Sequence, residues 1–388
     1  HLLHEFGEDQ KRFSGGLNLA YSDQSGEDVN AASDSTSSTI NGYAPGPINN
    51  KRDSLSALLN LRLSEYLLTL QFLESNRGDH FGINNYLPPP RKQTVISDQL
   101  WALNLDHNLE LDDGFELHWN VSRVVNSSEK NSQFLGVAPS FGGLPSDDDI
   151  VSDVLLEEQR DALVLDLKYE LGRHQLFASV SYDEIVVKEA SQLINLDPVT
   201  LLPDSQFNRF PAPVSQDQER SIRSLVLQDE YQINDKLTLT AGLRYDDFDE
   251  SFDHVSPRLA GVYLWDPEHI VKVQYAQAYR PPSLREAGGA ISLELEPETI
   301  DSFEVSFIHD SDDFLVRNTL YRAHIKDFIT FNNVVPFGYQ NSDGVRLYGY
   351  ELELKKQWSK AFWMKSSLAL QHTKDLATDD EIYGSTPA

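Results

Sequence analysis

The chain has 388 residues, no cysteine and a formal net charge of −29, with 61 acidic against 32 basic side chains. This balance argues against a nucleic-acid partner, because binding to phosphate needs clustered lysine and arginine, and the lack of cysteine excludes disulfide scaffolds, thiol catalysis and cysteine-based zinc sites. No apolar run reaches the roughly 18 residues that a membrane helix needs, although a membrane-spanning strand exposes only every second side chain to lipid.

Segments in which apolar and polar residues alternate are predicted as β-strands, because the side chains of a strand point to opposite faces with period two. The clearest pair is SLVLQDEYQI (224–233) and LTLTAGLRYDDF (237–248), joined by the turn NDK. In chain order, the 15 predicted strands span 12–23, 54–63, 66–77, 96–111, 115–126, 159–171, 174–187, 224–233, 237–248, 256–266, 269–280, 299–310, 314–331, 344–358 and 361–375.

The connections between these strands alternate between short and long. The short turns are 64–65, 112–114, 172–173, 234–236, 267–268, 311–313 and 359–360. The long loops are 24–53, 78–95, 127–158, 188–219, 281–298 and 332–343. In an antiparallel sheet every second connection lies on the same side. Short turns on one side and long loops on the other are typical of outer-membrane β-barrels, with the turns in the periplasm.

The two faces of the predicted strands differ in polarity. In 237–248, Leu239 and Leu243 share one face, whereas Thr240 and Arg244 share the other. Large charged groups on the polar face are too costly to bury dry, but a wide, wet lumen would hydrate them while the apolar face meets lipid. We therefore predict an all-β fold, a transmembrane antiparallel β-barrel. The alternative is a half-solvated soluble sheet. His107 and Asp229 fall on the apolar face and do not fit the barrel.

Five segments resemble the barrel of TonB-dependent outer-membrane receptors, in the order and at the spacing of that family. They are LVLQDEYQINDKLTLTAGLRYD (225–246), VQYAQAYRPPSLREA (273–287), LELEPETIDSFEVSF (293–307), TLYRAHIKDFITF (319–331) and GVRLYGYELEL (344–354). The resemblance covers nearly the whole chain and is sharpest over 220–370. It implies a parent barrel of about 22 strands with an N-terminal plug inside the lumen.

The resemblance places 12–23 near the third strand of the parent and 361–375 near the seventeenth. Residues 1–388 would then be a partial barrel domain of about 15 strands, without the signal peptide, TonB box, plug, opening strands and closing strands. The chain begins with the polar HLLHEFGEDQKRF, which has no signal-peptide character. We expect an internal piece of a longer receptor, whose plug would couple it to the TonB–ExbB–ExbD complex.

The function that the resemblance implies is active uptake of a scarce nutrient across the outer membrane of a Gram-negative cell. An iron–siderophore complex is the first expectation, and cobalamin or an oligosaccharide comes next. Outer-membrane lipid and lipopolysaccharide would surround the barrel. The alternatives are a soluble, secreted acidic β-protein that binds or cleaves glycans, and a passive porin. The sequence contains no Ser-His-Asp order, phosphate loop or HExxH, so we expect no enzyme.

Two sets of residues are candidates for binding. Arg280 and Arg285 lie in and beside the YRPPS box, where a strand meets an external loop, and are candidates for contact with an anionic substrate; the alternative is that the box shapes the strand exit. The loop aromatics Tyr86, Phe210 and Tyr339 are candidates for stacking on substrate, against ordinary loop packing.

Five carboxylates crowd the external loop after residue 245. Oxygen-rich clusters of this kind can bind Ca²⁺, whereas acidic loop tips are more often simply solvated or bridge to lipopolysaccharide through divalent ions. We expect no other cofactor. The candidate metal ligands are Asp246, Asp247, Asp249, Glu250 and Asp253.

Overall fold

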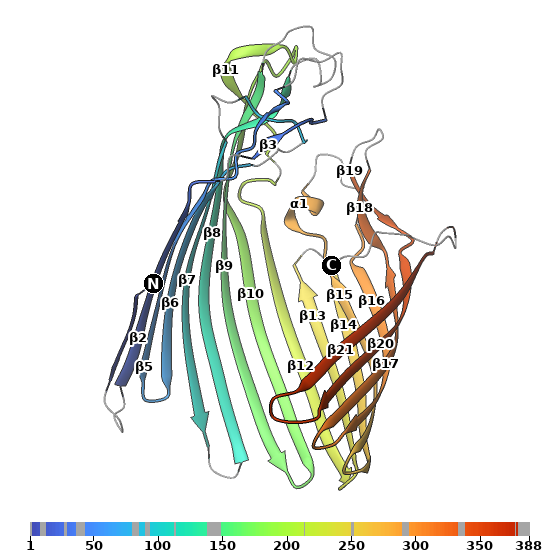
Figure 1. Ribbon diagram of the computed structural model, residues 1–388. Helices are drawn as coiled ribbons and strands as arrows, with labels where there is room; N and C mark the ends of the chain where they lie inside the picture. The colour runs from blue at the N-terminus through green and yellow to red at the C-terminus, as the bar shows by residue number, and fades with distance from the viewer. Residues whose placement is uncertain are drawn as a thin grey trace. The chain divides into compact units, whose positions relative to one another are not determined.

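The computed structural model is built almost entirely from antiparallel strands (Figure 1). It divides into two compact units: unit 1 comprises 1–108, 119–163 and 183–221, and unit 2 comprises 109–118, 164–182 and 222–388. No helix in the part of the chain that the structure describes is long and apolar enough to cross a membrane. The structure describes residues 2–7, 13–26, 29–35, 43–79, 85–89, 94–111, 114–137, 149–212, 214–249, 252–288, 295–332, 338–376 and 378.

Unit 1 contains a run of neighbouring strands in which each pairs antiparallel with the next. These are β1 (Leu2–Gly7), β2 (Phe13–Gln24), β5 (Arg52–Leu63), β6 (Tyr66–Arg77) and β7 (Val95–Glu110). The two-residue strands β3 (Asn30–Ala31) and β4 (Gly46–Pro47) pair separately. The long strands β8 (Phe115–Val137), β9 (Asp149–Leu171) and β10 (His174–Leu196) have residues in both units, and β11 (Pro203–Phe210) pairs with β10.

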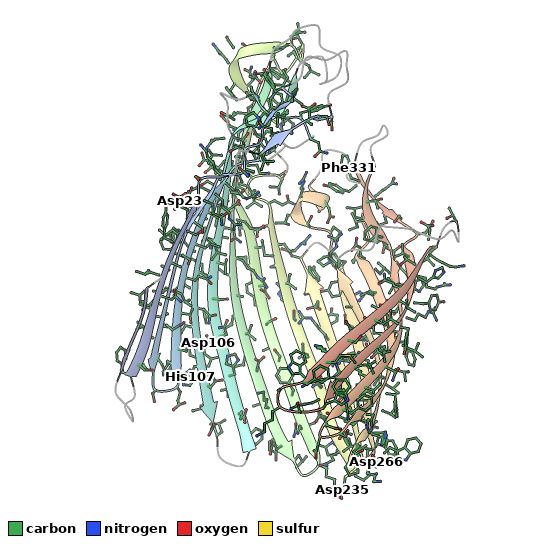
Figure 2. All side chains as sticks on the ribbon, in the orientation of Figure 1. Asp23, Asp106, His107, Asp235, Asp266 and Phe331 are labelled. Carbon is green, nitrogen blue, oxygen red and sulfur yellow. The ribbon has the colours of Figure 1, made fainter. Side chains whose placement is uncertain are left out.

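Unit 2 continues the same pattern. Its antiparallel run is β12 (Glu219–Asn234), β13 (Leu237–Phe248), β14 (Asp253–Asp266), β15 (His269–Arg280), β16 (Glu298–Asp310), β17 (Phe314–Lys326), β20 (Val345–Gln357) and β21 (Trp363–Asp375). The hairpin β18 (Phe328–Asn332) and β19 (Gly338–Ser342) and the short helix α1 (Leu284–Ala287) lie at the loop end. In Figure 2 Asp235 and Asp266 mark the turn end of this unit and Phe331 the opposite end.

The facing predicted from the sequence is confirmed on β13. Although their side chains are apolar, Leu239 is 41% exposed and Leu243 is 48% exposed. The charged Asp246 on the other face is 0% exposed. The polar face is cross-linked by side chains of neighbouring strands. Ser306 and Thr319 share a hydrogen bond of 2.9 Å. An apolar face left open and a polar face that bonds to itself are what a sheet facing lipid requires, because lipid cannot satisfy polar groups.

The two residues that did not fit the facing are both explained by their position near the turn end. His107 packs its ring 4.1 Å from Tyr66 and 5.5 Å from Trp119. His174 Nδ1 lies 2.8 Å from Asp229 Oδ2, within hydrogen-bond distance, and the His174 ring stacks on the Tyr231 ring with their centres 4.3 Å apart. Aromatic and amphipathic side chains gather at the membrane–water interface, so polar groups held among rings suit this level of the barrel.

The predicted loops 127–158 and 188–219 are wrong in part, because strands run far into them. β8 continues to Val137, β9 begins at Asp149, and β10 continues to Leu196 before β11 forms. The alternation of faces stops there, because these strand ends surround a small core of their own. One cluster contains Leu135, Ile150, Ile194 and Leu196, with Phe210 packed against it.

The single strand predicted over 314–331 is also wrong. Asp327 adopts a left-handed φ of 55° and divides it into β17 and β18. β18 then pairs with β19, which forms inside the predicted loop 332–343.

A close contact between β17 and β20 requires a glycine: Gly349 lies opposite Tyr321 in the register of these two strands. The Tyr321 ring occupies the space that a Cβ at residue 349 would take, so only glycine lets the ring lie flat on the sheet.

Candidate functional site

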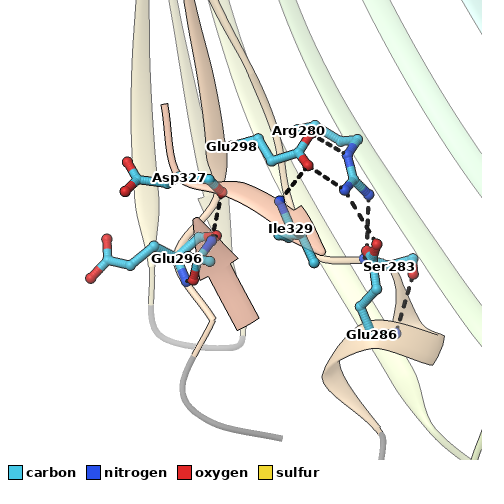
Figure 3. A network of polar contacts seen from close by, with 8 residues as sticks. Arg280, Ser283, Glu286, Glu296, Glu298, Asp327 and Ile329 are labelled. Carbon is cyan, nitrogen blue, oxygen red and sulfur yellow. Dashed lines mark hydrogen bonds and ion pairs between the residues drawn. The ribbon is translucent and has the colours of Figure 1, made fainter. Parts of the chain in front are cut away.

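Arg280, the last residue of β15, is held between two carboxylates (Figure 3). Its Nε donates to Glu298 Oε2 at 2.7 Å and its Nη2 donates to Glu298 Oε1 at 2.8 Å. Its Nη1 donates to Glu286 Oε2 at 2.9 Å. Both edges of the guanidinium are engaged in bidentate contacts of the strong, charge-assisted kind. The side chain is 45% exposed, whereas those of Glu286 and Glu298 are 14% and 12% exposed.

Glu286 belongs to a capping box at the start of α1. Ser283 Oγ accepts from the Glu286 backbone N–H at 3.2 Å, and Glu286 Oε2 accepts from the Ser283 N–H at 2.6 Å. Burial alone would raise the pKa of Glu286, but hydrogen bonds from Arg280 and Ser283 outweigh it and hold this pKa below the ordinary value. Pro281 and Pro282, which lack N–H donors, end the ladder of β15 here. The YRPPS box therefore fixes the direction in which the chain leaves the strand.

Glu298 connects this corner to the β18–β19 hairpin. Its Oε1 also accepts from the Ile329 backbone N–H at 2.7 Å. Asn341 makes a second connection. Its Nδ2 donates to the Asp327 carbonyl at 2.6 Å and to the Glu296 carbonyl at 2.9 Å, and its Oδ1 accepts from the Glu296 N–H at 2.8 Å (Figure 3). These contacts hold the hairpin against the ends of β15 and β16. Arg280 thus acts first as an organiser of the loop end of unit 2.

The other candidates in unit 2 are more open. Arg285 is exposed on α1. Tyr339, on β19, packs its ring 5.1 Å from Phe331 in an edge-to-face arrangement, and Phe331 is largely exposed. The hairpin therefore carries an aromatic pair next to an arginine corner. This combination of a flat apolar surface and fixed charges can contact a ligand that has both aromatic and anionic groups.

Tyr86 and Phe210, in unit 1, are engaged in loop packing. Phe210 packs on the cluster described above, and Tyr86 packs with Tyr43 against buried Phe134 and Val151. Tyr43 donates to Asp149 Oδ1 at 2.6 Å. Burial first, and this hydrogen bond second, raise the pKa of Tyr43 above its ordinary range. The geometry favours the packing alternative for Tyr86 and Phe210, and a contact with substrate stays a prediction.

Asp246 and Asp247, the first two of the candidate metal ligands after residue 245, point to opposite faces of β13 and have different partners. Asp246 is enclosed by Arg244, whose Nε donates at 2.7 Å, and by Ser224 Oγ at 2.5 Å. Asp247 points to the other face and pairs with Arg223 at 3.3 Å, opposite Asp253 in the register. Asp249 is exposed, and Glu250 lies outside the described residues. Over the described ranges, no group of three or more acidic or histidine side chains is arranged to hold a metal ion. The Ca²⁺ site stays a prediction.

Sequence reasoning named Arg280 but missed the residues that define its role. Glu286 could have been found from the spacing of Ser283 and Glu286, which is a capping box. Glu298 and Asn341 carried no such local signal. Glu298 lies 18 residues from Arg280 in the chain, and Asn341 lies 14 residues from Asp327.

Comparison with known proteins agrees with this fold. Residues 24–387 match the family described as TonB dependent receptor-like, beta-barrel. The iron-regulated outer membrane virulence protein of Vibrio cholerae is 28% identical over an alignment of 174 positions, which covers 38% of this chain and 27% of that protein. The chain therefore spans about a quarter of the length of the curated relatives it matches.

Solved structures share the fold at low sequence identity. The ferric yersiniabactin uptake receptor FyuA of Yersinia pestis superimposes with a TM-score of 0.70 at 11% identity, covering 98% of this chain and 59% of that one. The copper transporter OprC gives 0.68 at 13% identity, covering 96% and 60%. The siderophore receptor PirA of Pseudomonas aeruginosa gives 0.63 at 14% identity, covering 95% and 61%.

Proposed function

Because the chain belongs to the TonB-dependent receptor-like β-barrel family, we propose that it forms part of a receptor that actively imports an iron–siderophore complex across the outer membrane. The observation that carries this proposal is the family match over residues 24–387. The outward apolar face on β13 supports the membrane location. The V. cholerae relative is described as iron-regulated, and FyuA and PirA are described as receptors for ferric or siderophore cargo. Cobalamin and an oligosaccharide are the alternative cargoes.

The loop end of unit 2 is the proposed site of first contact. Tyr339 with Phe331 offers an aromatic surface, and Arg285 offers a cation outside the ion pairs of Arg280. Arg280 holds the β18–β19 hairpin through Glu298. In unit 1, Tyr86 and Phe210 pack in the loop core, and a contact of either ring with the cargo stays a prediction. Import would be energised by TonB through a plug elsewhere in the receptor.

The test is uptake of ⁵⁵Fe-labelled siderophores by cells that carry or lack the full-length gene, under iron limitation. The proposal expects uptake of at least one ferric siderophore to depend on the gene and to stop when a protonophore removes the energy source. Uptake that persists with a protonophore would identify a passive pore. Loss of growth on cobalamin or an oligosaccharide, with iron uptake unchanged, would assign the alternative cargo.

The second measurement separates binding from transport. Tyr339→Ala and Arg285→Gln should each weaken binding of the ferric siderophore to whole cells, whereas Arg317→Gln on the polar face of β17 should not. Unchanged binding in both loop variants would move the site away from the β18–β19 hairpin and α1.

A further inference from the structure

The outward face of β15–β21 in unit 2 carries three successive cross-strand rows that change character toward the loop end. The lowest of the three is apolar and open, with Leu320 60% exposed. It consists of Val273, Val305, Leu320, Tyr350 and Leu370. Two residues further along each strand is a row rich in rings, Tyr275, Phe303, Arg322, Tyr348 and His372. Arg322 Cζ lies 5.9 Å from the centre of the Tyr348 ring.

The third row is charged. It consists of Gln277, Asp301, His324, Arg346 and Lys374. Asp301 is already neutralised, because Lys326 Nζ lies 3.3 Å from its Oδ2 and the Tyr275 hydroxyl donates to its Oδ1 at 3.1 Å. Arg346 Nε is buried and has no hydrogen-bond partner among the described residues. A buried guanidinium nitrogen without an acceptor is costly, so the charge of Arg346 is poorly compensated among the described residues.

The basic patch is defined here as Arg322, Lys326, Arg346 and Lys374. It contains four permanent cations near the Asp301 carboxylate, in a chain whose net charge is −29. The same level is acidic on the outward faces of two other groups of strands. The row across β12–β14 reads Arg223, Asp247 and Asp253, and β5 and β6 in unit 1 present Asp53 and Glu74. The basic character is therefore local to β17–β21 and does not follow from composition.

The patch sits at the depth of lipid headgroups. Phe314 opens β17 after the short turn, so His324 is the eleventh residue of the strand, counting 314 as the first. A membrane-spanning strand needs about 9–11 residues. The row of rings below the patch fits the aromatic belt that marks the interface. Lipid acyl chains would end near Leu320, and phosphate groups would begin near Arg346.

We propose that the basic patch binds the phosphate groups of lipopolysaccharide in the outer leaflet, with Arg322 and Arg346 as the central contacts. Arginine is suited to this because its planar fork makes paired hydrogen bonds to phosphate oxygens. Arg322 is exposed and is therefore the first of the two to meet a phosphate oxygen. The sugar of the same lipid would lie along the rings of Tyr275 and Tyr348, which combine an apolar face with a polar tip. This binding is independent of the cargo that the receptor imports.

The test uses the full-length receptor in detergent, titrated with fluorescent rough-type lipopolysaccharide. Arg322→Gln/Arg346→Gln should weaken binding by roughly 30-fold, because each basic residue near an anionic membrane surface contributes a factor of about five. Arg317→Gln is the matched control, since it removes an arginine from the opposite face of the same strand. Equal affinity of the double variant and the control would overturn the proposal.

Two further arms identify the ligand and guard against misfolding. Dephosphorylated lipopolysaccharide and phosphatidylglycerol should compete poorly, and inorganic phosphate at millimolar concentration should not displace the lipid. Displacement by inorganic phosphate would show a simple anion site instead. Asp301→Asn should strengthen binding several-fold because it removes a carboxylate beside the patch. Unfolding cannot produce tighter binding. If Asp301→Asn does not bind lipopolysaccharide more tightly and the double variant binds as well as the wild type, the basic patch is not the binding site.

Discussion

The facing of β13 predicts how arginine substitutions should rank in energy. Leu239 and Leu243 are open on the apolar face, whereas Thr240 lies on the polar face opposite Glu230. An arginine on the lipid face costs about 2–4 kcal/mol near the midplane and about 0–1 kcal/mol near the interfaces. Leu243 is the seventh residue of a 12-residue strand and Leu239 the third, counting Leu237 as the first. Leu243→Arg should therefore cost about 2–4 kcal/mol and Leu239→Arg about 1–2 kcal/mol.

Thr240→Arg should cost less than either change, because the new guanidinium enters the hydrated face and can pair with Glu230. The assay is reversible urea unfolding of the full-length receptor in lipid vesicles, with free energies compared at a common slope. Matched heat-modifiable migration on gels would show that each variant reached the barrel state. A penalty for Thr240→Arg that equals or exceeds that of Leu239→Arg would show that the facing is inverted. Equal penalties for Leu239→Arg and Leu243→Arg would contradict the depth assigned to them.

Three further predictions concern location, the Arg280 corner and the glycine on β20. The full-length receptor should fractionate with the outer membrane and require detergent for extraction; recovery as a soluble periplasmic or secreted monomer would refute the barrel. Arg280→Gln should release the β18–β19 hairpin and increase its cleavage by protease, whereas Arg285→Gln should not. Because the folded pKa of Glu286 is depressed, its stabilising contribution is complete above the ordinary glutamate pKa of about 4.3 and should fall as the pH drops below that value. Hairpin cleavage in the wild type should therefore rise at acidic pH and become pH-independent in Glu286→Gln; an unchanged pH profile in that variant would assign the effect to other groups. Gly349→Ala should destabilise the barrel by about 1–3 kcal/mol through overpacking against Tyr321, and Tyr321→Ala in the same chain should recover part of the loss; simple additivity of the two changes would contradict the contact.

The strands that the sequence predicts best are those with one face in lipid. The bounds predicted for 66–77, 237–248 and 269–280 match β6, β13 and β15, because strict alternation changes to turn residues at both ends. The extensions of β8, β9 and β10 were missed because lipid no longer imposes alternation beyond the membrane. There, burial in a loop core decides, as Ile150 and Leu196 show.

The candidate site was predictable only where its signal is local. Arg280 stands out because it precedes two prolines, but its pairing with Glu298 depends on the register of β15 and β16. Tyr86 and Phe210 were chosen as loop aromatics, and composition cannot distinguish an aromatic that packs in a loop core from one that faces a ligand. The basic patch was invisible in a sequence of net charge −29, because its members come from strands whose pairing brings them into neighbouring rows.

Cysteine labelling on intact cells tests the membrane topology most directly, and the absence of native cysteine removes background. Ser205 lies on β11, within the predicted long loop 188–219. Asp235 lies in the short turn between β12 and β13, at the turn end of unit 2 (Figure 2). A cysteine at Ser205 should react with an impermeant maleimide, whereas one at Asp235 should react only after the outer membrane is broken. Labelling of Asp235 with Ser205 silent would reverse the topology, and labelling of both on intact cells would contradict the membrane-spanning barrel.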